Sequence, residues 1–272
     1  MKNGHTRSFE TCPPPEKAGS DYILSKTLYF FKKGCYNSDV MHHYIKDRLF
    51  GFTLAEVLIT LGIIGVVAAL TMPSLIAEHQ KKQTVARVKK AFSILGQAYQ
   101  FSQNENGFSD ELIDTSEAPN TQAVKDYVDK YWLPYLQVIK TCSNKGDCSY
   151  SQGATGPDGS KIAMEGNNRY SVILSDGTMV TFVPFNWSDD SGYYWGGTQK
   201  IYIDINGAQK PNILGRDVFM FEINSQKHVL RGLGQDYNED KIDKNCSKTG
   251  NAQYCAAKLI KDGWEMKKDY PW

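Results

Sequence analysis

One acidic residue, Glu56, lies at the start of a long apolar segment, and its carboxylate is a candidate for charge pairing. The 21 residues that follow, Val57 to Ala77, carry no formal charge. A carboxylate placed in a bilayer costs about 2.5–3.5 kcal/mol on insertion, so such a group usually has a partner. Two interpretations are open: an amine neutralises Glu56, or Glu56 lies near the end of a membrane span and its side chain reaches headgroup water.

Four of the six cysteines form two close pairs in the C-terminal region, Cys142 with Cys148 and Cys246 with Cys255. Such short spacings are typical of local disulfide loops in an oxidising compartment, so they indicate an exported domain. Three connectivities are possible for four cysteines. Zinc is the alternative chemistry, but neither pair has C-x-x-C spacing, and His79 and His228 have no ligand-like spacing to them.

Oxygen ligands gather between two expected strands, at Asp204, Asn206 and Asp217. Carboxylate and amide oxygens are the ligands that calcium prefers, so this segment is a candidate calcium site, and no other cofactor is expected. Asn-Gly with a nearby Asp is also ordinary turn chemistry, which is the alternative interpretation. No Ser-His-Asp, Cys-His or paired-carboxylate set stands out in the sequence, and we expect that the protein is not an enzyme.

The apolar segment is long enough to cross a membrane. At 1.5 Å per residue it spans roughly 30 Å of hydrocarbon, and it lacks the polar stripe that a core helix usually has. The sequence therefore predicts one membrane-spanning helix over residues 52–77. The positive-inside rule favours a cytoplasmic C-terminal part because five basic residues follow the span, whereas the cysteine pairs favour export. These basic residues are Lys81, Lys82, Arg87, Lys89 and Lys90.

The residues around the start of this segment form an ordered motif. They read Gly51-Phe52-Thr53-Leu54-Ala55-Glu56-Val57-Leu58-Ile59, after the basic residues Lys46 and Arg48. A basic leader that ends in Gly, then Phe, then an apolar helix with Glu as its fifth residue resembles the class III signal of type IV pilins and type II secretion pseudopilins. Pro73 also lies where many members of that family have a helix-kinking proline. The resemblance covers about residues 46–102.

This resemblance implies processing and then assembly. A prepilin peptidase would cut between Gly51 and Phe52 on the cytoplasmic side and methylate the new amine of Phe52. Glu56 would neutralise the freed amino terminus of a neighbouring subunit in a filament and help to set the axial register. The implied partners are copies of the chain, other pilin-like subunits, the peptidase and a membrane assembly platform. Some major pseudopilins also hold calcium in a C-terminal loop.

The resemblance also implies a location and a fold. The protein would lie in the cytoplasmic membrane with one span and an exported C-terminal domain, and later in a pilus or pseudopilus. Its fold would be α+β, with a long N-terminal helix packed against a small antiparallel sheet. A conventional cleaved secretory signal is the rival interpretation, but the apolar run is longer than usual and the small-x-small site Val66-Val67-Ala68 lies inside it.

Residues 1–51 would be an unusually long leader. The short stretch from Met41 to Gly51 already contains Lys46 and Arg48, so Met41 is a simpler start. Residues 1–40 would then be untranslated, and a disordered extension is the alternative. In either case we expect the mature protein to begin after Gly51.

Beyond Pro73 the pattern becomes that of an amphipathic helix over residues 78–106, which Asn106-Gly107 would cap. Its apolar stripe offers a surface on which a globular α+β domain, residues 107–272, can pack. The stripe comprises Val85, Val88, Phe92, Leu95, Ala98, Tyr99 and Ser102. The basic residues on the other faces could bind phosphate groups, but solvated helix faces have the same composition.

Within the globular domain we expect a short helix that Pro134 ends, then a loop over residues 142–161. The period changes to two from Tyr170, and a hairpin with an Asp-Gly turn is predicted. The expected strands are Tyr170–Leu174, Thr178–Val183, Lys200–Ile205 and Val218–Ile223. Residues 246–264 have a short helical pattern and are expected to form a disulfide-pinned element over the sheet.

Charge and aromatic content leave two functional alternatives. Residues 1–51 hold 8 of the 31 basic and 5 of the 30 acidic residues, so their removal leaves 23 and 25 and a formal net charge of −2. This balance disfavours nucleic acid as the main partner, and a minor pilin for DNA uptake is the first alternative. The second is a membrane-anchored carbohydrate-binding, adhesive or hydrolytic ectodomain, because the rings of Phe185, Trp187 and residues 193–195 could stack on sugars.

Overall fold

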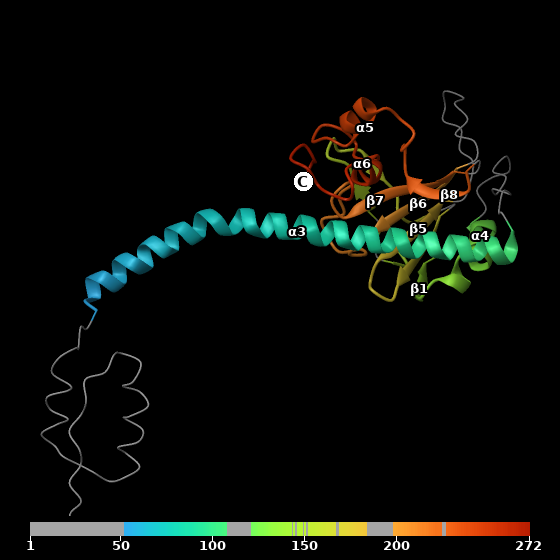
Figure 1. Ribbon diagram of the computed structural model, residues 1–272. Coiled ribbons are helices and arrows are strands. Elements are labelled where there is room, and N and C mark those ends of the chain that lie inside the picture. The colour runs from blue at the N-terminus through green and yellow to red at the C-terminus, as the bar shows by residue number, and fades with distance from the viewer. Residues whose placement is uncertain are drawn as a thin grey trace, which may run out of the picture. The chain divides into compact units, whose positions relative to one another are not determined.

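The structure is a computed structural model of the chain. It describes residues 52–107, 121–142, 144, 146–148, 150, 152–166, 169–183, 198–224 and 227–272. The chain divides into two compact units, Met1–Ala68 and Ala69–Trp272. The described part of the first unit is the start of helix α3, and the strands and the other described helices belong to the second unit (Figure 1).

Helix α3 runs without interruption from Leu54 to Asn106, a length of 53 residues that includes Pro73. The predicted segments 52–77 and 78–106 are therefore parts of one helix. The helix ends as predicted: the amide of Gly107 donates to the Gln103 carbonyl at 3.0 Å, and Gly107 has a φ of +74°. A positive φ at this position favours glycine, which pays no Cβ penalty there.

In the described part of the chain, six antiparallel strands form the main sheet, in the order β1-β4-β5-β6-β7-β8. The four predicted strands are all present as β4 to β7, and the two edge strands, β1 and β8, were not predicted. The bounds are β1 Val138–Cys142, β4 Tyr170–Leu174, β5 Met179–Val183, β6 Thr198–Asp204, β7 Val218–Asn224 and β8 Val229–Gly232.

A second, two-stranded sheet pairs β2 (Ala154–Thr155) with β3 (Lys161–Ile162). The prediction that residues 142–161 are entirely loop is wrong for these strands. Each strand has only two residues, so its sequence carries no period-two pattern from which it could be recognised.

One face of the main sheet packs against α3. Phe182 pairs with Ile201 and Ile201 pairs with Phe221, so these three buried side chains lie in a row on the same face. The ring of Phe92 on α3 lies 5.4 Å from the ring of Phe221, measured between centroids. The predicted stripe on α3 faces the core, and the buried residues of the helix are Thr84, Val88, Ala91, Leu95, Ala98, Tyr99 and Ser102.

The remaining helices are short. The predicted helix before Pro134 is α4 (Thr121–Tyr131), followed by the 3₁₀ turn η2 (Leu133–Tyr135), and the C-terminal helices are α5 (Glu239–Asn245) and α6 (Cys255–Lys261). Helix α6 packs closely on β8, because a Cβ at Gly232 would come within 2.5 Å of the Ala257 backbone. The chain is thus an α+β protein with a long N-terminal apolar helix and an antiparallel sheet, as predicted.

Candidate functional site

Helix α3 begins with reciprocal hydrogen bonds between Thr53 and Glu56. The amide and the hydroxyl of Thr53 donate to Oε2 of Glu56 at 2.9 Å and 2.8 Å, and the Glu56 amide donates to the Thr53 hydroxyl at 3.2 Å. This is a capping box, in which two side chains satisfy backbone amides that have no partner at a helix start. Thr53 was not among the predicted functional residues, although the T-x-x-E spacing of Thr53 and Glu56 is a sequence signal for this cap.

The first half of α3 exposes apolar side chains on all sides. The exposed fraction of its large hydrophobic residues ranges from 43% at Val57 to 81% at Leu54, and Phe52, just before the helix, is 85% exposed. Among the residues that the structure describes, α3 is the helix that is long and apolar enough to cross a membrane. A continuous apolar surface of this size marks a membrane or protein contact.

Pro73 lies inside α3, where it cannot donate the backbone hydrogen bond to the carbonyl of Ala69. The following residue, Ser74, turns its hydroxyl back to the Thr71 carbonyl at 2.9 Å. The helix continues through this point to Asn106. Pro73 therefore interrupts the hydrogen-bond ladder without ending the helix.

The candidate calcium residues come together at the turn between β6 and β7. Asp204 is fully buried, and its carboxylate accepts hydrogen bonds from the Tyr150 hydroxyl and the Asn206 amide. The Asp217 carboxylate accepts from the backbone amides of Asn212 and Ile213. We call this cluster the carboxylate turn: Tyr150, Asp204, Asn206, Asn212, Ile213 and Asp217.

Burial raises the pKa of both acids of the carboxylate turn. Removal from water raises the pKa of Asp204 to about 8, and it also raises the pKa of Asp217. Asp217 lies close enough to add a like-charge effect on Asp204. Burial thus shifts both acids toward the neutral form, and a proton or a cation would relieve the unfavourable burial of negative charge.

Two side-chain oxygens of the carboxylate turn would suit a bound cation. The side-chain oxygens of Asn206 and Asn212 are buried and have no hydrogen-bond donor in the part of the chain that the structure describes. Asp204, Asn206 and Asp217 would hold the ion, with Asn212 as a further oxygen ligand. The hydrogen bonds within the turn also satisfy its carboxylate oxygens without an ion, so calcium binding stays a prediction.

Cys142 and Cys148 form a disulfide beside a buried carboxylate. Glu165 accepts hydrogen bonds from the backbone amides of Gly146 and Cys148, both at 2.6 Å. These hydrogen bonds hold the disulfide loop to Glu165. The two sulfur atoms and Glu165 lie within metal-binding distance of one another, but sulfurs joined in a disulfide are not thiolate ligands. The group is therefore a structural loop.

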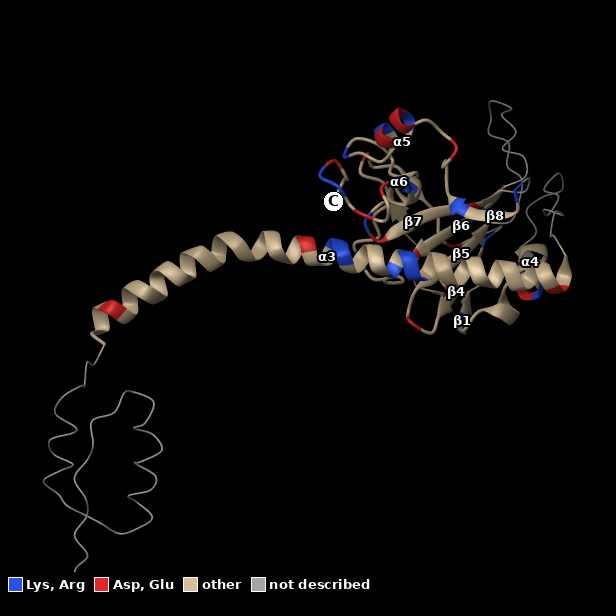
Figure 2. Cartoon of the chain, in the orientation of Figure 1, with Lys and Arg blue, Asp and Glu red and all other residues tan. Residues whose placement is uncertain are grey.

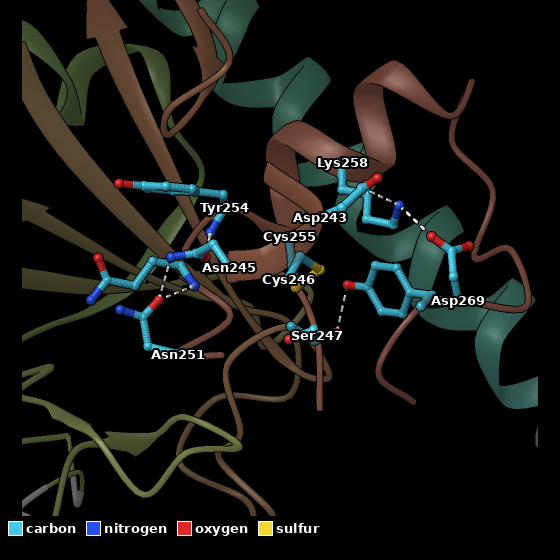
Figure 3. Close-up of a disulfide and its surroundings, with 12 residues drawn as sticks. Asp243, Asn245, Cys246, Ser247, Asn251, Tyr254, Cys255, Lys258 and Asp269 are labelled. Atoms are coloured by element: carbon cyan, nitrogen blue, oxygen red, sulfur yellow. Dashed lines mark hydrogen bonds and ion pairs between the residues drawn. A yellow bond between two sulfur atoms is a disulfide. The ribbon is translucent and has the colours of Figure 1, made fainter. Parts of the chain in front are cut away.

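Cys246 and Cys255 form the second disulfide, which joins the end of α5 to the start of α6 (Figure 3). Next to this loop, the Asn245 side chain donates to the Asn251 side chain at 2.7 Å and accepts from the Tyr254 amide at 2.8 Å. Each of the four cysteines in the described part of the chain is thus joined to its nearer neighbour in sequence. These hydrogen bonds and the disulfide hold the two helices together.

A buried lysine holds the C-terminal segment to α6. Lys258 Nζ lies 2.6 Å from carboxylate oxygens of both Asp243 and Asp269, and 3.6 Å from Asp262 (Figure 3). Burial alone would lower the pKa of Lys258, but these carboxylates outweigh it and raise the pKa. Nearby, the buried Tyr270 hydroxyl donates to the carbonyl of Gly215 at 2.6 Å. The members of this cluster are scattered along the chain, so no sequence pattern predicted it.

A family model described as a family of unknown function (DUF6613) matches residues 74–272. The chain belongs to this family. No curated protein and no solved structure matches the chain. The DUF6613 match begins at Ser74, directly after Pro73, so it covers the carboxylate turn and both disulfides and leaves the Thr53–Glu56 cap outside.

Several predictions for the DUF6613 chain fall on parts that the structure does not describe. Gly51 and the rest of the expected leader, residues 1–51, lie outside the described residues, as does the aromatic stretch within residues 184–197. Phe52, Glu56, Pro73, the four paired cysteines and the calcium residues are described. Phe52 lies just before α3, and Glu56 and Pro73 lie within it. The four cysteines and the calcium residues lie in the second unit.

Proposed function

We propose that the protein is a structural subunit of a type IV pilus or a type II secretion pseudopilus. In this proposal a prepilin peptidase removes residues 1–51 and methylates Phe52, and α3 holds the subunit in the cytoplasmic membrane. The C-terminal domain is exported. Membrane assembly proteins then polymerise the subunits through the apolar part of α3.

The observation that carries the proposal is the order of features at the start of α3. The Gly51-Phe52 junction is followed directly by the Thr53–Glu56 cap and then by an exposed apolar helix. The second half of the same helix lies in the core of an α+β domain. A subunit that leaves lipid for contacts with neighbouring helices needs a helix segment that is apolar on all sides. It also needs a second segment that is fixed to a folded domain.

The proposal gives Glu56 two successive contacts. Before assembly its carboxylate is held by Thr53, and the positive end of the helix dipole also favours an acid in the first turn. After processing, the positive amine of a neighbouring Phe52 would neutralise the charge in an apolar filament core. On assembly, neighbouring α3 helices replace lipid at the apolar surface of α3. Little apolar area is therefore exposed to water either in the membrane or in the filament.

The exported domain fits the same proposal through its covalent bonds. Both disulfides close short loops, of 6 and 9 residues in sequence separation, which suits an oxidising compartment. The Lys258 cluster and Tyr270 then fix the C-terminal segment. Such a domain stays folded outside the cytoplasm while α3 moves between environments.

A filament assay tests the proposal. The chain is expressed with a prepilin peptidase and an assembly system, and sheared filaments are compared with membranes by immunoblot. Glu56→Ala is expected to remove the chain from the filament fraction and to leave it processed and membrane-bound. A Glu105→Ala variant, which removes an acid from the other end of α3, is the matched control and should assemble. Normal filaments with Glu56→Ala would contradict the assembly role and favour an anchored adhesive ectodomain.

A further inference from the structure

A band of positive charge follows the apolar part of α3. We define the juxtamembrane belt as Lys81, Lys82, Arg87, Lys89 and Lys90. In Figure 2 a red segment and then blue segments follow the long uncharged stretch of α3. Residues 78–90 contain these five cations and one acid, Glu78, so their formal net charge is +4.

Two cations of the juxtamembrane belt have partners within the chain. Lys81 pairs with Glu78 and Lys90 pairs with Asp176, each at 2.7 Å. Lys82, Arg87 and Lys89 are exposed and form no ion pair with any residue that the structure describes. Three cationic side chains are thus available to an external anion.

Their position along α3 places these cations beside a bilayer surface. At 1.5 Å per residue, Lys82 lies about 8 Å and Lys89 about 18 Å beyond Ala77. Side chains on a helix tilt toward its N-terminus, so all three point back toward the apolar segment. A headgroup layer extends roughly 5–8 Å beyond the hydrocarbon, and charges act over about 8–10 Å at physiological salt.

We propose that Lys82, Arg87 and Lys89 form a binding surface for anionic phospholipid headgroups. Their ammonium and guanidinium groups would pair with lipid phosphates while the preceding apolar residues remain in the acyl chains. Nucleic acid offers the same phosphate chemistry, but continuity with a membrane-length helix favours lipid. The proposal rests on the entry of α3 into a bilayer and does not depend on filament assembly.

The test uses the full chain reconstituted into phosphatidylcholine bilayers. Spin-labelled phosphatidylglycerol and spin-labelled phosphatidylcholine are added in turn, and electron paramagnetic resonance gives their relative association with the protein. The variant K82Q/R87Q/K89Q removes the three exposed cations. The matched control, K244Q/K248Q/K268Q, removes three exposed lysines from the C-terminal region, with the same change of charge.

We expect several-fold selectivity of the wild-type chain for phosphatidylglycerol at low salt, since one cation near an anionic surface raises binding by about fivefold. K82Q/R87Q/K89Q should reduce the ratio to near one, and the control should retain it. Salt at about 0.5 M, where the Debye length is only roughly 4 Å, should abolish the selectivity. Equal association of the two lipids with wild type would overturn the proposal, as would equal loss in the control or failure of the chain to stay in the bilayer. A labelled DNA duplex that binds wild type but not K82Q/R87Q/K89Q, without lipid selectivity, would assign the surface to nucleic acid instead.

Discussion

The backbone amide and the hydroxyl of Thr53 both donate to one carboxylate oxygen of Glu56, and the Glu56 amide donates back to that hydroxyl. The acid that we propose to meet a neighbour's amine is therefore already part of the start of its own helix. Thr53 lies between the expected cleavage junction and this acid. It can thus position Glu56 before any second subunit is present.

Replacement of Thr53 tests this positioning role. Thr53→Val keeps the shape of the side chain and removes the hydroxyl, which should weaken the cap by about 1 kcal/mol. We expect normal processing and membrane insertion but fewer sheared filaments on immunoblots. Thr53→Ser retains the hydroxyl and should assemble normally. Equal filament yields from Thr53→Val and wild type would show that the cap does not contribute to assembly.

Lys258 should be important for the stability of the C-terminal domain. Lys258→Met keeps most of the side-chain volume and removes the charge that three aspartates share. We expect the free energy of unfolding to fall by about 1–3 kcal/mol, because charged hydrogen bonds are lost while the partner aspartates keep partial access to water. Urea unfolding of the detergent-solubilised chain measures this. Lys244→Met changes an exposed lysine and should have little effect, and equal stability of the two variants would contradict the role given to Lys258.

Because the pKa of Asp204 is raised, we expect the free energy of unfolding to depend on pH. Its pKa is about 8 in the folded chain, above its ordinary value near 3.9, so the folded state binds a proton that the unfolded state releases. This contribution is complete below about pH 4 and is lost as pH rises through 8, with a slope of at most about 1.4 kcal/mol per pH unit. Asp217 adds an effect of the same sign.

Urea unfolding in EDTA at pH 5, 6, 7 and 8 measures this slope. Asp204→Asn keeps an uncharged group at the Tyr150 hydroxyl and should flatten the profile. Asp240→Asn, at an exposed position, is the control and should leave the slope unchanged. A wild-type profile that is flat, or that rises toward pH 8, would contradict the assigned protonation of Asp204.

Calcium bound at the carboxylate turn would compete with that proton. We expect millimolar calcium to raise Tm more at pH 8 than at pH 5, since the carboxylates are ionised at the higher pH. Magnesium, which prefers a more rigid octahedral site, should act less strongly. Asp217→Asn should remove the shift. An unchanged Tm with calcium at pH 8 would leave the turn as a purely hydrogen-bonded structure.

The long helix and the central strands could be predicted because their signals are local. An uncharged run, a 3.6-residue stripe and the Asn106-Gly107 cap define α3, and the Asp-Gly turn defines the β4–β5 hairpin. The edge strands lack such a signal. In β1, three of the five residues, including Lys140, are exposed, so the strand depends on pairing with β4 and does not alternate.

The contacts within the candidate sites depend on residues far apart in sequence. Tyr150 meets Asp204 across 54 residues, and no spacing rule connects them. Helix α5 buries only Ile242, so its seven residues carry no apolar stripe, although Asn238 caps its start by accepting from the Lys241 amide. Local patterns therefore identified the elements and most candidate residues, whereas the fold determines which of them meet.

The mature N-terminus tests the central claim most directly. The chain is expressed with and without a prepilin peptidase, and intact-mass and N-terminal peptide mass spectrometry define its first residue. The account predicts an N-methylated Phe52 that appears only when the peptidase is present. An uncut chain, or a cut beyond Ala68, would contradict pilin-type processing and leave an anchored or secreted α+β domain.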